Sequence, residues 1–310
     1  MIEVKGKGCI SAKIIKDSVS LDGVRMTTFE LEYPRFILSE VNTHRVLSKN
    51  SASSRAIPVN TMHEIIKANT ARPIYWGKNQ PGMAASVELD EMSIESSVGV
   101  WDAARDQAIS HSKLLSSIGN HKQVANRLTE PFQVMKTVLS GTEYSNLYAL
   151  RDHADAQPEF AELARCMRIA RDQSVPKLLK AGEWHVPYVA TRRSENSELT
   201  YWADEQTQID VETAKKISAS CCAQVSYRRL DTSLEKALQI FDKLNLGSED
   251  EIAHASPVEH QATPMIATHN NPTSDWEEGV THMRRGGSLW SGNLRGWIQY
   301  RQLIPREAVW

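Results

Sequence analysis

A β-hairpin signal near the N-terminus constrains the fold of this chain more than any other feature. Two strand-like runs, at 9–20 and 24–33, are joined by Asp22-Gly23, a dipeptide that favours the tight turn between antiparallel strands. Apolar and polar residues alternate through 28–33, which predicts that one face of the second strand is buried. We therefore expect an antiparallel sheet that begins with this hairpin.

Helical periodicity dominates the part of the chain that follows. A long helix is expected over 91–117, with an apolar stripe made of Ile94, Val98, Trp101, Ala104 and Ala108. Further helices are expected from residue 36 and over 131–140, 143–151, 158–174 and 232–246, the last with a capping box of Thr232 and Glu235. Residues 56–90 are expected to be irregular, with a structured loop at 76–83. Strands and long helices together predict a mixed α/β fold of the α+β type.

The composition is that of an ordinary globular protein. The 310 residues are 41% hydrophobic and 24% charged with a net charge of −2, which disfavours a generally basic nucleic-acid binder. The four cysteines show no metal-ligand spacing, so we expect no metal site and a reducing compartment. No apolar run approaches the ~20 residues of a membrane span. A cytoplasmic protein without a membrane partner is therefore expected.

The segment 43–55 is the strongest candidate for a functional site. It carries a histidine, several basic side chains and a dense run of hydroxyls and amides, directly after a predicted buried turn of helix. Arg55 can offer a bidentate fork to a phosphate or to the edge of a pyrimidine. The backbone and hydroxyls of Ser51, Ser53 and Ser54 can line an anion nest. The alternative is a polar helix end that continues into a loop.

The order of residues in this segment resembles the signature of the flavin-dependent thymidylate synthases. That signature has Arg-His-Arg followed by a spaced Ser, Asn-Glu, Ser and Arg. The chain matches it at His44, Arg45, Ser48, Asn50, Ser53 and Arg55. It departs at Thr43, where the family has the first Arg, and at Ser51, where the family has Glu.

A second block strengthens the resemblance. In the family, an upstream arginine that reaches a nucleotide phosphate precedes Asn-x4-Arg and then His-Ala-Gln-x-Glu. Here Arg127 takes the place of the upstream arginine, and Asn146 and Arg151 keep the family spacing. Gln157 and Glu159 also match, whereas Asp155 replaces the family histidine.

A third block lies at an unexpected place in the chain. The family has an Arg-Val-Ser-Tyr-like strand and a His-x-Ser/Thr-Pro-x-Glu-His turn near its N-terminus, whereas similar sequences lie here at 223–227 and 254–260. We interpret this order as a circular permutation, which is plausible because the termini of compact domains often lie close together. The resemblance then covers 28–180 and 217–264.

The resemblance implies the domain organisation. Residues 1–264 would form a flavin-dependent thymidylate synthase-like domain, and 265–310 a C-terminal extension. This tail is expected to form a lid over the active site through an apolar helical stripe of Trp297, Ile298, Tyr300, Leu303 and Ile304.

The resemblance also implies a role for each matched residue. The substrate would be held by Glu40, Ser51, Ser53, Ser54, Arg55, Arg127 and Arg151. Of these, Ser53, Arg55 and Arg151 would be catalytic, and Arg151 would polarise the base. FAD would be held by Thr43, His44, Arg45, Val46, Asn146, Asp155, Ser226, His254, Ser256 and Glu259. Two alternatives stay open: Arg151 as an exposed helix arginine, and His254 as a structural cap of its turn.

The implied reaction is reductive methylation of dUMP to dTMP at carbon 5. Methylenetetrahydrofolate would give the carbon, NADPH would reduce FAD, and a homotetramer would build each active site from several subunits. Glu40 replaces a family glutamine and can accept a hydrogen bond from an amino or imino group of the base. An alternative is therefore methylation or hydroxymethylation of another pyrimidine nucleotide, such as dCMP. Cations, glycines and aromatics interleave at 284–297, so a second alternative is a non-catalytic binder of single-stranded nucleic acid.

Overall fold

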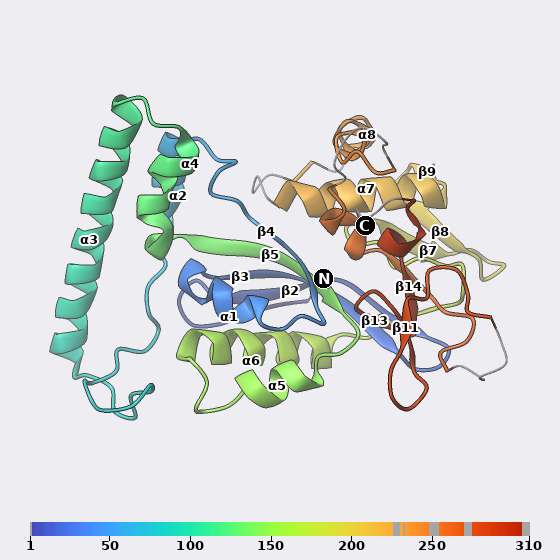
Figure 1. The fold of residues 1–310 in the computed structure, drawn as a ribbon, viewed down its shortest axis with the longest axis horizontal. Coiled ribbons are helices and arrows are strands. Elements are labelled where there is room, and N and C mark those ends of the chain that lie inside the picture. The colour runs from blue at the N-terminus through green and yellow to red at the C-terminus, as the bar shows by residue number, and fades with distance from the viewer. Residues whose placement is uncertain (1, 226–229, 232, 248–253, 270–274, 306–310) are drawn as a thin grey trace.

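A six-stranded sheet lies at the centre of the molecule (Figure 1). The structure is a computed structural model, and it describes residues 2–225, 230–231, 233–247, 254–269 and 275–305. The sheet order is β1 (Glu3–Lys5), β2 (Ser11–Ser20), β3 (Arg25–Pro34), β5 (Val134–Gly141) and β4 (Ser48–Ser51). Each of these neighbours pairs antiparallel, and β6 (Lys177–Leu179) adds a parallel pair to β2. The predicted mixed α+β fold with an antiparallel sheet is confirmed.

The hairpin β2–β3 confirms the turn predicted at Asp22-Gly23. Gly23 has a φ of 74°, a conformation that glycine adopts without steric cost. The Ser20 hydroxyl accepts a hydrogen bond from the backbone of Val24 at 3.1 Å and closes the turn. The pairing continues in register to Ser11 and Glu32, with one irregularity between Ile14 and Lys16. The N-terminal hairpin therefore forms at the turn that local sequence signals predict.

The main hydrophobic core lies between the sheet and helices α5 (Ser145–Arg151) and α6 (Pro158–Gln173). Both helices follow one side of the sheet in Figure 1. Phe29, Leu31 and Tyr33 of β3 are fully buried there, as the alternation predicts. Burial of each such side chain is worth ~1.5–3 kcal/mol. Gln157 caps α6 by accepting a hydrogen bond from the backbone of Phe160, so a matched residue of the second block has a structural role.

Helix α3 (Glu91–Ser117) confirms the long helix predicted at these positions. The Asp90 side chain caps it by accepting a hydrogen bond from the backbone of Ser93 at 2.9 Å. The helix lies at one edge of the molecule with α2 (Val59–Ala68) and α4 (Lys122–Ala125) (Figure 1). The expected stripe is correct in part, because Ala104 is exposed whereas Ile109 and Ser112 continue the buried face.

The C-terminal half covers the other side of the sheet. The small strands are β7 (Ala190–Arg193), β8 (Leu199–Trp202), β9 (Gln208–Ile209), β10 (Ala262–Pro264), β11 (His282–Met283), β12 (Leu289–Ser291), β13 (Leu294–Arg295) and β14 (Trp297–Gln299). The helices are α7 (Val211–Gln224), α8 (Leu234–Asp242) and the 3-10 turns η4 (Ser256–Glu259) and η5 (Tyr300–Leu303). Val138 of the central strand packs against Cys222 and Val225, which joins α7 to the sheet.

Several predicted elements differ in the structure. Residues 59–68 form α2 rather than irregular chain, and the helix expected over 131–140 is the turn η2 (Asn126–Phe132) followed by β5. Strand β5 is buried on both faces, so its sequence shows no alternation that would distinguish it from a buried helix. Both corrections concern segments whose structure is set by their neighbours in space.

The C-terminal predictions need similar corrections. Ala223 and Gln224 end helix α7 rather than forming a strand, and Ser226 and Tyr227 lie outside the described residues. Helix α8 is shorter than predicted and has Ser233 as its N-cap, while Thr232 of the expected capping box lies outside the described residues. The expected helical stripe of the tail is wrong, because 297–299 form a strand that pairs with β10. Among the described residues, no helix is both long and apolar enough to cross a membrane.

Candidate functional site

Arg151, at the end of α5, reaches back to the segment that resembles the family signature. Its Nε donates a hydrogen bond to His44 Nε2 at 3.1 Å, and its Nη1 lies 3.6 Å from Glu40 Oε2. The guanidinium carbon lies 4.9 Å from the centre of the Phe160 ring, which contacts His44 edge-on. We call Glu40, His44, Lys49, Arg151 and Phe160 the His44 cluster. It brings together three residues that the sequence assigned to one site.

The surroundings of His44 favour its neutral form. Burial lowers its pKa, and the positive charges of Arg151 and Lys49 lower it further. Lys49 Nζ donates to the His44 carbonyl at 2.6 Å and to the Leu47 carbonyl at 3.0 Å. Burial lowers the pKa of Lys49 to about 8, although Glu259 acts in the opposite direction. The cluster therefore presents a cation and a neutral imidazole side by side.

A second group of polar side chains surrounds Glu130. Its Oε1 accepts from Arg35 Nη2 at 2.9 Å and from Ser54 Oγ at 3.3 Å, and Arg127 Nη1 lies at 3.4 Å. We call Arg35, Ser54, Arg127 and Glu130 the Glu130 cluster. Ser54 and Arg127 were both predicted to bind substrate, whereas Arg35 and Glu130 were not.

The loop that carries Ser54 is held by residues of α4 and η2. Asn126 Nδ2 donates to the Ser54 carbonyl at 2.8 Å and to the Ile57 carbonyl at 2.9 Å. Lys122 Nζ donates to the Ala56 carbonyl at 3.2 Å. Arg55 is exposed, and it has no ion-pair partner within the described ranges. The segment 53–57 therefore presents one exposed cation, Arg55, on a backbone that is held in place.

Strand β4 connects the two clusters. His44 precedes it and Ser54 follows it, and its four residues span about 10 Å at ~3.3 Å per residue. Pairing with β5 fixes the strand, since Ser48 lies opposite Ser140 and Ser51 opposite Thr137. His44 and Ser54 therefore lie on either side of a strand that the sheet holds in place.

The C-terminal half contacts the same strand. Asn50 Nδ2 donates to the Cys222 carbonyl at 3.3 Å, and Ser48 Oγ donates to Asn293 Oδ1 at 3.1 Å. Gln299 Nε2 donates to the Glu259 carbonyl at 3.0 Å, and Glu259 itself pairs with Arg301 at 2.6 Å. The segments that resemble the family's N-terminal part, and part of the tail, thus lie beside the signature segment.

The remaining predicted residues lie on the surface or in structural contacts. Those with exposed side chains are Thr43, Arg45, Asn146, Asp155, His254 and Ser256. Val46 and Ser53 are half-buried, and Ser51 forms a hydrogen bond with Thr137 Oγ1 at 2.8 Å. Ser226 lies outside the described residues. No group of three or more potential metal ligands is placed to hold an ion within the described part of the chain.

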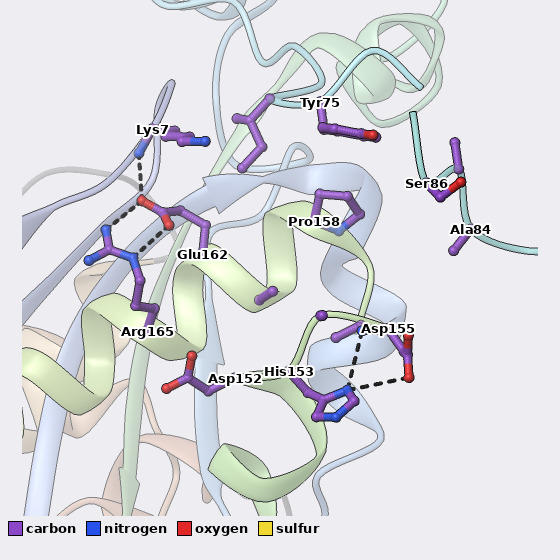
Figure 2. Close-up of a pocket in the computed structure, with 15 residues that line it drawn as sticks. Lys7, Tyr75, Ala84, Ser86, Asp152, His153, Asp155, Pro158, Glu162 and Arg165 are labelled. Atoms are coloured by element: carbon purple, nitrogen blue, oxygen red, sulfur yellow. Dashed lines mark hydrogen bonds and ion pairs between the residues drawn. The ribbon is translucent and has the colours of Figure 1, made fainter. Parts of the chain in front are cut away.

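A cavity of about 800 Å³ lies between the start of α6 and the loop at 74–86, and its lining residues are drawn in Figure 2. Asp155 lines it, together with Lys7, Tyr75 and Arg165. Arg165 pairs with Glu162 at 2.7 Å, so the charge of this arginine is already balanced. Of the predicted site residues, Asp155 alone lines this cavity. The two clusters described above therefore lie outside it.

The residues assigned to FAD fit that cofactor in part. Arg45 offers an exposed cation for a diphosphate, with no ion-pair partner in the described part of the chain. Asn146 offers an exposed amide, and His44 a neutral ring, for the edges of a flavin. The exposed carboxylate of Asp155 does not suit an anionic diphosphate, and Glu259 is already paired with an arginine. Arg45, His44 and Asn146 are therefore the assigned residues whose polar groups fit FAD.

Comparison with known proteins gives a remote structural likeness. No protein-family model matches the chain, and no curated protein matches it. Crystal structures of the UMP/dUMP methylase PolB from Streptomyces cacaoi, bound with 5-Br UMP and with 5-Br dUMP, align with TM-scores of 0.44 and 0.43 at 15% identity. Each alignment covers 54% of this chain and 91% of that chain. Scores this low do not establish a shared fold, so the proposal below depends on the residues of this chain.

Several residues of the two clusters were missed by sequence reasoning. Arg35 lies in a predicted strand-to-helix connection, and Lys49 and Glu130 are single charges without a motif. Phe160 is an ordinary apolar position of an amphipathic helix. No local sequence signal distinguishes these residues, because their contacts depend on pairing between distant segments.

Proposed function

We propose that this chain is a flavin-dependent enzyme that methylates carbon 5 of a pyrimidine deoxynucleotide, with dUMP as the substrate. The contact of Arg151 with His44 and Glu40 carries the proposal, because it joins two sequence blocks that were matched to the family independently. If 43–55 were only a polar helix end, and Arg151 only an exposed helix arginine, nothing would require that contact. We further propose that the order of the blocks reflects a circular permutation.

The two clusters would bind different parts of the nucleotide. The Glu130 cluster and Arg55 would hold the nucleotide phosphate, since paired arginines and hydroxyls are the donors that phosphate oxygens prefer. Arg151 would face the base and stabilise negative charge that develops on it during attack by carbon 5. The Phe160 ring limits the movement of its guanidinium. Strand β4 sets the separation between phosphate and base.

FAD would be held by Arg45, His44 and Asn146. When bound, it would pass a hydride from NADPH to the methylene carbon that methylenetetrahydrofolate contributes. Because His44 Nε2 accepts from Arg151, the neutral ring carries its proton on Nδ1 and can donate one hydrogen bond to the cofactor without adding positive charge beside Arg151. The chain's own task is therefore to orient the two ring systems and to polarise the base.

A cytosine nucleotide is the second candidate substrate, and Glu40 favours it. The Glu40 carboxylate lies 3.6 Å from Arg151 and is therefore beside the group expected to face the base. A carboxylate accepts a hydrogen bond from the amino group of cytosine, whereas it repels the carbonyl oxygen of uracil at the same position. Methylation or hydroxymethylation of dCMP would use the same site.

The nucleic-acid-binding alternative is less well supported. Trp290 is 2% exposed, and its ring is covered by Arg284 at 3.6 Å and stacked on His282 at 5.9 Å. Trp297 is fully buried. Base stacking needs an aromatic face that is free to receive a base, and neither of these two rings offers one.

An absorbance titration tests the proposal. The purified protein is loaded with FAD, and the flavin band is followed during titration with dUMP and, separately, with dCMP. A flavin spectrum that responds to dUMP alone supports the first proposal, and a response to dCMP alone supports the second. A protein that takes up no FAD would contradict both.

A further inference from the structure

Three donors converge on a single carboxylate oxygen in the Glu130 cluster. Arg35, Ser54 and Arg127 all lie within 3.4 Å of Glu130 Oε1. Two guanidinium groups and a hydroxyl around one oxygen form the donor set with which proteins bind a phosphate oxygen. We propose that the Glu130 carboxylate is an internal anion that occupies the phosphate site and competes with the nucleotide phosphate for it. The identity of the incoming ligand rests on the proposed function.

The backbone segments that carry the donors are held without the Glu130 side chain. The backbone of Arg35 donates to the Gln133 carbonyl at 2.9 Å, which fixes the turn η1 (Arg35–Ile37) against η2. Asn126, one residue before Arg127, holds the Ser54 carbonyl. When the carboxylate leaves, these segments stay in place, and two guanidinium groups and a hydroxyl lose their common acceptor. The backbone of the site is therefore built before its external ligand arrives.

The charge around the cluster exceeds what one carboxylate can balance. The guanidinium groups of Arg35 and Arg127 both face the Glu130 carboxylate, so two positive charges meet one negative charge. A phosphate monoester carries about −1.5 to −2 charges near neutral pH, and it balances this cluster better than the single charge of Glu130 does. A nucleoside without phosphate has no charge with which to displace the carboxylate.

The carboxylate can leave the cluster at little cost. The Glu130 side chain is 25% exposed, so the displaced charge would enter water rather than stay unpaired in the interior. The Arg127 side chain is 61% exposed and can follow an incoming phosphate. Glu130 is therefore proposed to set a threshold for binding: it lowers the affinity for every phosphate ligand and rejects neutral nucleosides.

Removing the charge while keeping the shape tests this competition. Glu130→Gln retains an oxygen that accepts the same hydrogen bonds but lacks the negative charge. Glu183→Gln is the matched control, because Glu183 also pairs with an arginine, Arg193, in a part of the chain that contributes no residue to either cluster. Calorimetric titration with inorganic phosphate and with dUMP, at about 0.1 M ionic strength, gives the affinities. Glu130→Gln is expected to bind both at least about fivefold more tightly than wild type, and Glu183→Gln is expected to match wild type.

Each outcome supports or contradicts the proposed competition between Glu130 and phosphate. Unchanged or weaker phosphate binding in Glu130→Gln overturns the competition and makes Glu130 a support for the arginines. Tighter phosphate binding without any binding of dUMP or dCMP supports the internal anion while rejecting the proposed function. Absence of phosphate and nucleotide binding in all three proteins rejects both. If thermal unfolding shows that Glu130→Gln does not fold, Glu130→Ala takes its place with the same expectations.

Discussion

Arg151 connects three groups that are far apart in the sequence. It donates to His44, pairs with Glu40 and lies over the Phe160 ring. Arg151→Ala is expected to abolish turnover while FAD stays bound, because the base would lose its polarising cation. Product formation and retained flavin absorbance are the measurements. Arg168→Ala is the matched control, since Arg168 also lies on a helix and pairs with Asp152. Normal activity in the Arg151 variant would remove this residue from the proposed site.

The same variant has a readout that does not depend on catalysis. Arg151 is one of the charges that lower the pKa of His44, so Arg151→Ala is expected to raise that pKa while burial keeps it below its usual value. Titration of the imidazole by NMR measures the change. A His44 resonance that titrates identically in both proteins would mean that the two side chains are not in contact in solution.

Arg127 belongs to the phosphate end of the site. Arg127→Ala is expected to weaken nucleotide binding by about tenfold or more, since a hydrogen bond to a charged group is worth ~1.5–3 kcal/mol. Its effect on the flavin spectrum is expected to be small, because Arg127 of η2 contacts Glu130 and not the residues around His44. Titration with dUMP provides the affinity. An unchanged nucleotide affinity would contradict the phosphate role of this residue.

At the scale of elements, strand β14 makes the tail part of the core. Trp297 is fully buried in a cluster with Val24, Met26 and Leu179, and its indole donates to the Val24 carbonyl at 3.1 Å. Trp297→Ala is expected to lower the free energy of unfolding by ~3–5 kcal/mol. Urea denaturation measures this, with Trp276→Ala as the control because Trp276 is 42% exposed. A small effect at Trp297 would show that the tail is not needed for the fold.

Elements with local signals were the ones that sequence reasoning predicted well. The hairpin needed only a turn dipeptide and alternation. Helices α3 and α6 needed only helical periodicity and caps, and α5 was predicted without a capping side chain. Strand β5 and strand β14 were predicted as helices, because runs buried on both faces carry no period. Helix α2 was missed because Pro58, its N-cap residue, makes no side-chain capping bond.

In the candidate site, too, only residues with a local sequence signal could be predicted. His44, Arg127 and Arg151 could be selected from the sequence because spacing within each block matches a known signature. Arg35 and Glu130 could not, since their ion pair joins residues 95 positions apart in the chain. Tertiary pairing of η1 with η2 creates that contact, and nothing near either residue in the sequence encodes it.

At the scale of the whole molecule, a network of hydrogen bonds between buried polar side chains joins the sheet to the C-terminal half. Thr28 Oγ1 forms hydrogen bonds with Ser140 Oγ at 2.6 Å and His185 Nε2 at 2.8 Å, and Ser140 Oγ reaches His260 Nδ1 at 2.9 Å. Burial lowers the pKa of His260 to about 3, and it lowers that of His185 well below its usual value. Both rings are therefore neutral in the folded protein.

The lowered pKa values of His185 and His260 predict a loss of stability in mild acid. Because the unfolded histidines have a pKa of about 6.5, the unfolded state binds more protons than the folded state below that pH. The free energy of unfolding should thus be highest above about pH 6.5 and fall as the pH decreases toward about 3. Carboxylates such as Glu162, whose pKa is lowered by Arg165, add to the loss only at lower pH. Urea midpoints at stepwise pH values measure the slope, which His260→Gln should reduce.

The assembly of the molecule gives the last prediction. We propose a homotetramer in which neighbouring subunits complete each active site, while Arg127 and Arg151 of one site belong to the same chain. Arg151→Ala should be inactive alone, whereas Arg127→Ala should need more dUMP for turnover. Co-refolded mixtures of the two, assayed at low dUMP, should not exceed the summed activities of the separate variants, because no mixed site would hold both arginines. Sedimentation should give four times the 34.8 kDa of one chain. Recovery of activity in the mixture would place the two arginines of each site on different chains, and active monomers would contradict the tetramer.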